Sequence, residues 1–126
     1  MAINQSITIR ARPDEVFVAL ASAEVFGKVT GAPADLEEQE GGAFSLFGGQ
    51  ITGRTVEIIP NKRIVQAWRA EPWPEGAYSI VKFEIKKTGT TTTVNLEHAG
   101  FPDNAGEHLE GGWHKMYWEP LKAYFE

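Results

Sequence analysis

The stretch LEGGWHKMYWEPLKAY, residues 109–124, decides the fold, because its apolar residues recur every three or four positions. This spacing predicts a long C-terminal helix with one apolar face. The residues on that face are Leu109, Trp113, Met116, Tyr117, Leu121 and Tyr124. Asn104, followed three residues later by Glu107, predicts a capping box where the helix begins. Pro120 should kink the helix, since it cannot donate a hydrogen bond to the carbonyl of Met116.

Upstream of this helix the apolar pattern has the period of β-strands. Residues 3–9 alternate apolar and polar, which predicts a half-buried strand. Pro13, with Asp14 and Glu15 after it, then suits the first turn of a helix. Turn residues separate five further apolar stretches. These predicted strands are Ala43–Phe47, Gln50–Ile59, Arg63–Ala70, Tyr78–Lys87 and Thr90–His98.

The order of these elements predicts an α+β fold. We expect a curved antiparallel sheet of about six strands wrapped around the long C-terminal helix, with one or two short helices after the first strand. No linker, repeat or low-complexity tract interrupts the chain, so residues 1–126 are expected to form one domain. A sheet that curls around one helix can leave a cavity between the two.

Composition excludes several classes of function. The net charge of −5 argues against nucleic-acid binding, which needs clustered basic residues. With no cysteine, the chain has no thiol nucleophile, thiolate metal ligand or disulfide. No apolar run has the length of a membrane helix, and residues 1–10 do not resemble a signal peptide. We therefore expect a cytoplasmic protein without membrane partner or cofactor.

The histidines are His98, His108 and His114, and they lack the spacing of a zinc motif. Together with Asp103 and Glu107, His98 and His108 form a conceivable metal or acid–base cluster. Surface or capping roles are the favoured interpretation, so no metal site is predicted. An enzyme on this fold would need a polar group inside the cavity, for which His98 and Gln66 are the candidates.

Several motifs in order along the chain resemble one family. They are Pro13-Asp14-Glu15-Val16-Phe17, Gly41-Gly42-Ala43-Phe44, Ile51-Thr52-Gly53, Ile59-Pro60, Ile64-Val65-Gln66-Ala67-Trp68-Arg69, Trp73-Pro74-Glu75-Gly76 and Gly112-Trp113-His114-Lys115-Met116-Tyr117-Trp118-Glu119-Pro120. The chain thereby resembles the C-terminal domain of the activator of the heat-shock protein 90 ATPase. The resemblance implies the helix-grip fold of the START-like, or SRPBCC, superfamily.

That resemblance implies a non-enzymatic, cochaperone-like binding domain whose partner is a heat-shock protein 90 type chaperone. Such a domain would favour the closed, hydrolysing state of the chaperone over its open state. Two segments are expected to supply the contact surface. They are the loop Trp73, Pro74, Glu75 and Gly76, and the acidic run 35–40 with Asp35, Glu37 and Glu38.

The alternative is a carrier or sensor of a small apolar molecule held between sheet and helix. The residues expected to line its cavity are Trp68, Phe83, Trp113, Met116 and Tyr117. The competing interpretation of these aromatic residues is plain core packing. Trp73 is open to two interpretations as well, an exposed contact residue or a plug at one end of the sheet. Gly111 and Gly112 indicate a close backbone approach, an opening beside the sheet, or a frayed turn.

Overall fold

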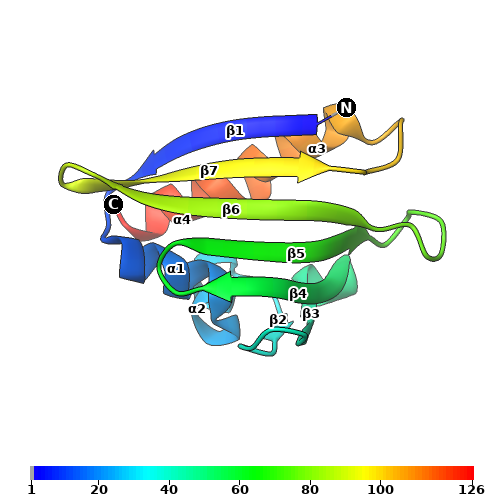
Figure 1. Cartoon of the computed structure of the whole chain (residues 1–126), viewed down its shortest axis with the longest axis horizontal. Helices are drawn as coiled ribbons and strands as arrows, with labels where there is room; N and C mark the ends of the chain where they lie inside the picture. Colours follow the sequence, from blue (N-terminus) through cyan, green and yellow to red (C-terminus); the bar gives the residue numbers. More distant parts are fainter. Residues whose placement is uncertain (1) are drawn as a thin grey trace.

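The computed structural model describes residues 2–126, and seven antiparallel strands form one curved sheet across it (Figure 1). The spatial order of the strands is β1-β7-β6-β5-β4-β3-β2, so neighbours in space are mostly neighbours in sequence. The strands are β1 Ala2–Ile9, β2 Ala34–Leu36, β3 Ala43–Leu46, β4 Ile51–Ile59, β5 Arg63–Ala70, β6 Ser79–Thr88 and β7 Thr91–Ala99. Only β1 joins the sheet out of sequence order, by pairing with β7 along its whole length.

The helices cover one face of this sheet (Figure 1). They are α1 Pro13–Ala21, α2 Ala23–Thr30, α3 Gly106–Gly112 and α4 Glu119–Tyr124, with the π-helical stretch Trp113–Trp118 joining α3 to α4. Pro13 occupies the first turn of α1, and the backbone N–H of Arg12, at the N-cap, donates to Oε1 of Glu15 at 2.9 Å. The predicted helix-grip arrangement is thus confirmed. No helix within residues 2–126 combines the length and apolar character needed to cross a membrane.

The sheet has seven strands instead of about six, because the short edge strand β2 falls in a segment without a strand pattern. Asp35 lies on this strand and pairs with Ser45 of β3. Only three residues long, β2 shows too little alternation for a period of two to be visible.

The C-terminal helix begins later than predicted, and the capping box at Asn104 and Glu107 is wrong. The residue before the helix is Ala105, which provides no side-chain cap, and α3 starts at Gly106. Asn104 therefore precedes the helix by two residues, and Glu107 lies exposed in its first turn.

Next to Pro120 the C-terminal helix departs from α-helical geometry, and this departure lies on the N-terminal side of the proline. The N–H of Glu119 donates to the carbonyl of His114, five residues back, instead of the usual four. This i→i+5 pattern runs through Trp113–Trp118 and places more residues in each turn than an α-helix does. The faces of the helix are consequently shifted after Trp113.

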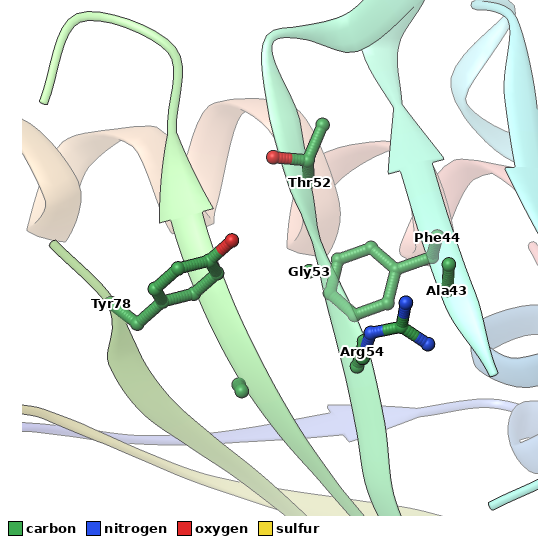
Figure 2. Close-up of a pocket in the computed structure, with 7 residues that line it drawn as sticks. Ala43, Phe44, Thr52, Gly53, Arg54 and Tyr78 are labelled. Atoms are coloured by element: carbon green, nitrogen blue, oxygen red, sulfur yellow. The ribbon is translucent and has the colours of Figure 1, made fainter. Parts of the chain in front are cut away.

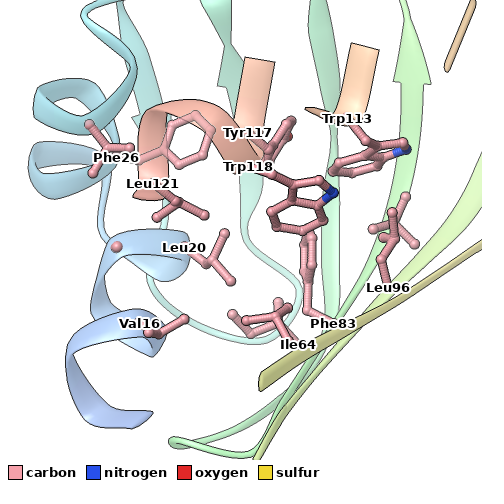
Figure 3. Packing of buried hydrophobic residues seen from close by; sticks show 14 of the residues in the cluster. Val16, Leu20, Phe26, Ile64, Phe83, Leu96, Trp113, Tyr117, Trp118 and Leu121 are labelled. Carbon is pink, nitrogen blue, oxygen red and sulfur yellow. The ribbon is translucent and has the colours of Figure 1, made fainter. Parts of the chain in front are cut away.

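The core lies between the sheet and the helices, and Figure 3 shows how it is filled. Alternate residues of β5, β6 and β7 point inward, among them Ile64, Phe83 and Leu96, each at most 2% exposed. Helix α1 supplies Val16 and Leu20 from the other side (Figure 3). Burial of such side chains contributes about 1.5–3 kcal/mol each, which anchors both helical segments to the sheet.

Candidate functional site

Four of the five residues predicted to line a cavity meet inside the molecule. Trp68 on β5 stacks on Trp113 of the C-terminal helix with 5.6 Å between ring centroids. Tyr117, one turn later, lies 4.4 Å from Trp113 and 6.2 Å from Phe83 of β6. All four are at most 4% exposed. The structure therefore brings these aromatic side chains into one cluster, which links three elements of the fold.

Met116 does not belong to this cluster, and Trp118 takes the place that sequence reasoning gave to Met116. Met116 is 38% exposed, whereas Trp118 is 1% exposed and stacks on Trp113 at 5.7 Å. The π-helical stretch explains both differences, because it brings residues five apart, such as Trp113 and Trp118, onto one face. A regular α-helical period would instead have placed Met116 there, so the sequence pattern alone was misleading.

His98 is fully buried beside the cluster, so the predicted surface or capping role is wrong. Its Nδ1 accepts a hydrogen bond of 3.1 Å from the indole N–H of Trp113. This fixes the proton on Nε2, which donates to Ser79 Oγ at 2.8 Å. Ser79 in turn donates to the carbonyl of Trp68 at 2.8 Å. The chain of bonds connects the C-terminal helix to β7, β6 and β5.

The same environment decides the charge of His98. Burial lowers the pKa of His98 to about 4, so the imidazole is neutral at physiological pH. Both ring nitrogens are engaged by protein groups, which gives His98 a structural role. His108 and His114 lie on the C-terminal helix, away from His98, and both side chains are exposed. Within residues 2–126, no three His, Asp or Glu side chains gather as they would around a metal.

Three polar atoms at the interface of sheet and helix are buried without a hydrogen-bond partner. They are Oε1 of Gln66, Nε1 of Trp68 and the hydroxyl of Tyr117. Gln66 and Trp68 lie two residues apart on the inner face of β5. Burial raises the pKa of the Tyr117 hydroxyl, and the neighbouring Trp68 indole opposes this by a smaller amount. A buried polar atom without partner costs about 1–3 kcal/mol, so this group is a candidate ligand site.

Trp73 folds back onto the end of the core, as the plug interpretation predicts. Its ring lies 5.7 Å from that of Trp68 and packs against the core cluster. Arg69 of β5 fixes the backbone of this loop by donating to the carbonyls of Trp73 at 2.7 Å and Pro74 at 3.3 Å. The exposed part of this loop consists of Pro74, Glu75 and Gly76.

Two carboxylates of the acidic run 35–40 accept hydrogen bonds from nearby backbone N–H groups. Glu37 accepts a hydrogen bond from the N–H of Ala43 at 3.3 Å, and Glu40 accepts one from the N–H of Ile58 at 3.0 Å. Strand β4 has a bulge between Thr55 and Glu57, and Glu40 satisfies a donor just beyond it. The carboxylates of Asp35 and Glu38 are exposed. Glu37 and Glu40 thus have a structural role that the sequence pattern did not reveal.

Comparison with known proteins gives this architecture a family. Residues 10–126 match the family model described as activator of Hsp90 ATPase homolog 1-like protein. The chain belongs to this family. It is 30% identical over 118 residues to the human activator of 90 kDa heat shock protein ATPase homolog 1. That match covers 94% of this chain and 35% of the human protein.

Other proteins described as activators of the heat-shock protein 90 ATPase are similar to this chain in sequence or in structure. The corresponding protein of Dictyostelium discoideum is 33% identical over 112 residues, which cover 88% of this chain and 28% of that protein. The crystal structure of an HSP90 activator from Plasmodium falciparum superposes with a TM-score of 0.92 at 26% identity. It covers 98% of this chain and 95% of that structure.

The chain spans about a third of the length of the curated activators it matches. The predicted family is confirmed, and its members are activator or binding domains rather than catalytic enzymes.

Proposed function

We propose that this chain is a non-enzymatic, cochaperone-like domain that binds a heat-shock protein 90 type chaperone. The observation that supports this most is the similarity to the Plasmodium falciparum HSP90 activator, which extends over 98% of this chain. The membership of the activator family agrees with it. The chaperone as partner, the cochaperone activity and a cytoplasmic location are inferences from these relatives.

The proposed contact surface combines the loop Trp73–Gly76 with the carboxylates of Asp35 and Glu38. Trp73 packs on Trp68, and Arg69 fixes the backbone of the loop, so its exposed residues are held in one conformation. A loop that is already ordered loses less conformational entropy on binding, which favours affinity. Glu37 contributes by holding the turn before β3 rather than by direct contact.

An amide NMR titration with the chaperone of the same host, with and without ATP, tests this proposal. We expect shifts clustered at Trp73–Gly76 and around Asp35 that grow when ATP is present. Glu75→Lys should weaken binding, whereas Glu126→Lys at the chain terminus is the charge-matched control. Absence of shifts at saturating chaperone would contradict the proposal.

The buried polar atoms support a second candidate function, the binding of a small molecule. Trp68 Nε1 can only donate, Gln66 Oε1 can only accept, and the Tyr117 hydroxyl can do both. A ligand hydroxyl offers one donor and two acceptor sites, which match this set in kind, and the surrounding aromatic rings suit an apolar ligand body. The ligand class is therefore an aromatic alcohol or a similar molecule with one polar group.

This second function is tested with a matched pair of probes, 2-naphthol and naphthalene. We expect 2-naphthol to shift the indole N–H signal of Trp68 and to bind more tightly than naphthalene. Tyr117→Phe should reduce that difference. Equal binding of both compounds, or shifts confined to the protein surface, would contradict a role for the three polar atoms.

A further inference from the structure

The outer face of the sheet, opposite the helices, carries a hollow of about 530 Å³ (Figure 2). In Figure 2 the helices lie behind the sheet, and the rings of Tyr78 and Phe44 flank Gly53. The residues that line the hollow are Ala43, Phe44, Thr52, Gly53, Arg54, Ala67 and Tyr78. Its size falls within the range of ordinary ligand pockets.

Gly53 forms the floor of this hollow, and the backbone leaves no room for another residue there. A Cβ on Gly53 would overlap the carbonyl oxygen of Ala67 and would lie 2.8 Å from Cζ of Phe44. Because Gly53 is in register with the buried Phe44 and Trp68, this crowding lies on the core side of the sheet, and on the outer side the hollow is bounded by the backbone of Gly53.

An apolar surface continues from the hollow across the sheet. Cross-strand pairing places Ala43, Arg54, Ala67, Ile80 and Ala99 side by side in one row. Ile80 is 49% exposed, and Tyr78 beside the row is 52% exposed. Large apolar side chains exposed next to one another are typical of a protein-binding surface. We call Ala43, Arg54, Ala67, Tyr78 and Ile80 the outer-face patch.

Arg54 within the patch and Arg69 at its border are each held by main-chain carbonyls. Arg54 donates to the carbonyl of Gly41 at 2.9 Å, and Arg69 donates to the carbonyl of Trp73 at 2.7 Å. The guanidinium of Arg69 also lies 6.0 Å from the centroid of the Tyr78 ring. Among residues 2–126, no carboxylate lies within 4.0 Å of the side-chain nitrogens of either arginine, so their charges are not neutralised within the chain.

Several other charged side chains of the outer face form ion pairs within the chain. Arg63 pairs with Glu57 and Glu84 at 3.3 Å each, and Lys82 pairs with Glu97 at 3.5 Å. The outer-face patch is thus a cationic and apolar region on a chain whose net charge is −5. Charge complementarity calls for a partner that brings carboxylates to it.

We propose that the outer-face patch docks a protein segment in which an apolar side chain stands beside a carboxylate. The apolar side chain enters the hollow over Gly53 beside the ring of Tyr78, and the carboxylate pairs with Arg54 or Arg69. On the same outer face, the cross-strand pairs Arg69–Thr52, Thr52–Ser45 and Ser45–Asp35 continue from the border of the patch to Asp35. The inference rests on the proposed function in one respect, because one of the two test partners below is the chaperone.

The test uses two probes in amide NMR titrations. One is the host chaperone, and the other is a blocked hexapeptide that alternates Asp and Leu, compared with its Lys and Leu counterpart. We expect shifts at Arg54, Tyr78 and Ile80 with the acidic peptide and not with the basic one. Ile80→Asp and Arg54→Glu should each weaken binding about tenfold.

Matched controls use exposed residues outside the patch. Val18→Asp replaces an apolar residue of helix α1 that is 43% exposed, and Arg10→Glu reverses an exposed charge. Both controls should bind like the unmodified chain. All four variants must retain the amide dispersion of the folded protein, which separates loss of binding from loss of fold.

The outcomes separate this inference from the proposed function. If the acidic peptide binds at the patch and the chaperone does not bind at all, the inference is supported and the chaperone proposal is contradicted. If the chaperone binds without shifting the patch signals, if the patch variants bind it normally, and if neither peptide binds, the inference is overturned. The chaperone proposal then stands. Patch shifts that depend only on the concentration of the chain itself identify a second copy as the occupant and also overturn it.

Discussion

The indole N–H of Trp113 donates to Nδ1 of His98 across 3.1 Å, and this bond fastens the C-terminal helix to strand β7. The proton therefore remains on Nε2, and this N–H donates a hydrogen bond to Oγ of Ser79. One neutral histidine thereby serves as acceptor for the helix and donor for the sheet. A protonated His98 would be a donor at both nitrogens and would lose the bond to Trp113.

We therefore predict that stability falls as the pH is lowered. The folded state holds the pKa of His98 at about 4, below the ordinary value of 6.5, so the unfolded chain binds the proton first. The free energy of unfolding should drop by about 3 kcal/mol between pH 7 and pH 4. Urea denaturation at several pH values measures this. His98→Gln should flatten the dependence, and His114→Gln should leave it intact.

Removal of the Ser79 hydroxyl should destabilise the chain. Ser79→Ala leaves the Nε2 donor of His98 buried without a partner, which costs about 1–3 kcal/mol. Ser6→Ala removes an exposed hydroxyl from β1 and should change the free energy of unfolding little. Chemical denaturation of both variants checks the difference. Equal stability of the two would show that the bond from His98 contributes nothing.

Two glycine substitutions should change stability in opposite directions. Gly53→Ala brings a methyl group against the carbonyl of Ala67 and should cost at least about 3 kcal/mol. Gly111→Ala places a methyl group in open space on an exposed helical turn and should stabilise the chain by about 1 kcal/mol. Thermal unfolding of the two variants measures both effects. A stabilising Gly53→Ala would refute the described close packing of Gly53 against Ala67 and Phe44.

Tyr117→Phe should leave stability nearly unchanged or raise it, because the hydroxyl that it removes is buried without a partner. We expect a change below about 1 kcal/mol in the free energy of unfolding. Tyr124→Phe, at an exposed site, is the control. A loss well above that value would mean that the Tyr117 hydroxyl has a partner in the folded protein, either the neighbouring Trp68 indole or a bound molecule.

The sequence predicted the architecture well because apolar and polar residues alternate along the longer strands over enough positions to reveal a period of two. Strands β6 and β7 each keep a period of two across at least eight residues, and the C-terminal helix changes to a helical period. Two glycines in that helix remained ambiguous. An added Cβ on Gly111 or Gly112 meets no atom within 4 Å, which excludes the close backbone approach.

The errors in the site have identifiable physical causes. The π-helical stretch moved Met116 outward and Trp118 inward, and only the presence of Pro120 hinted at such a shift. His98 follows Thr92, Val94 and Leu96 on the inward face of β7, so its parity could have shown that it is buried. The outer-face patch depends on which residues pair across strands, and cross-strand register is not visible in a single sequence.

The ATP turnover of the host chaperone, followed as this chain is added, tests the central claim most directly. If the chain is an activator-type domain, turnover should rise and saturate with its concentration, and Glu75→Lys should shift that curve to higher concentration. Turnover that stays flat at concentrations where the chaperone is saturated with the chain would contradict the account.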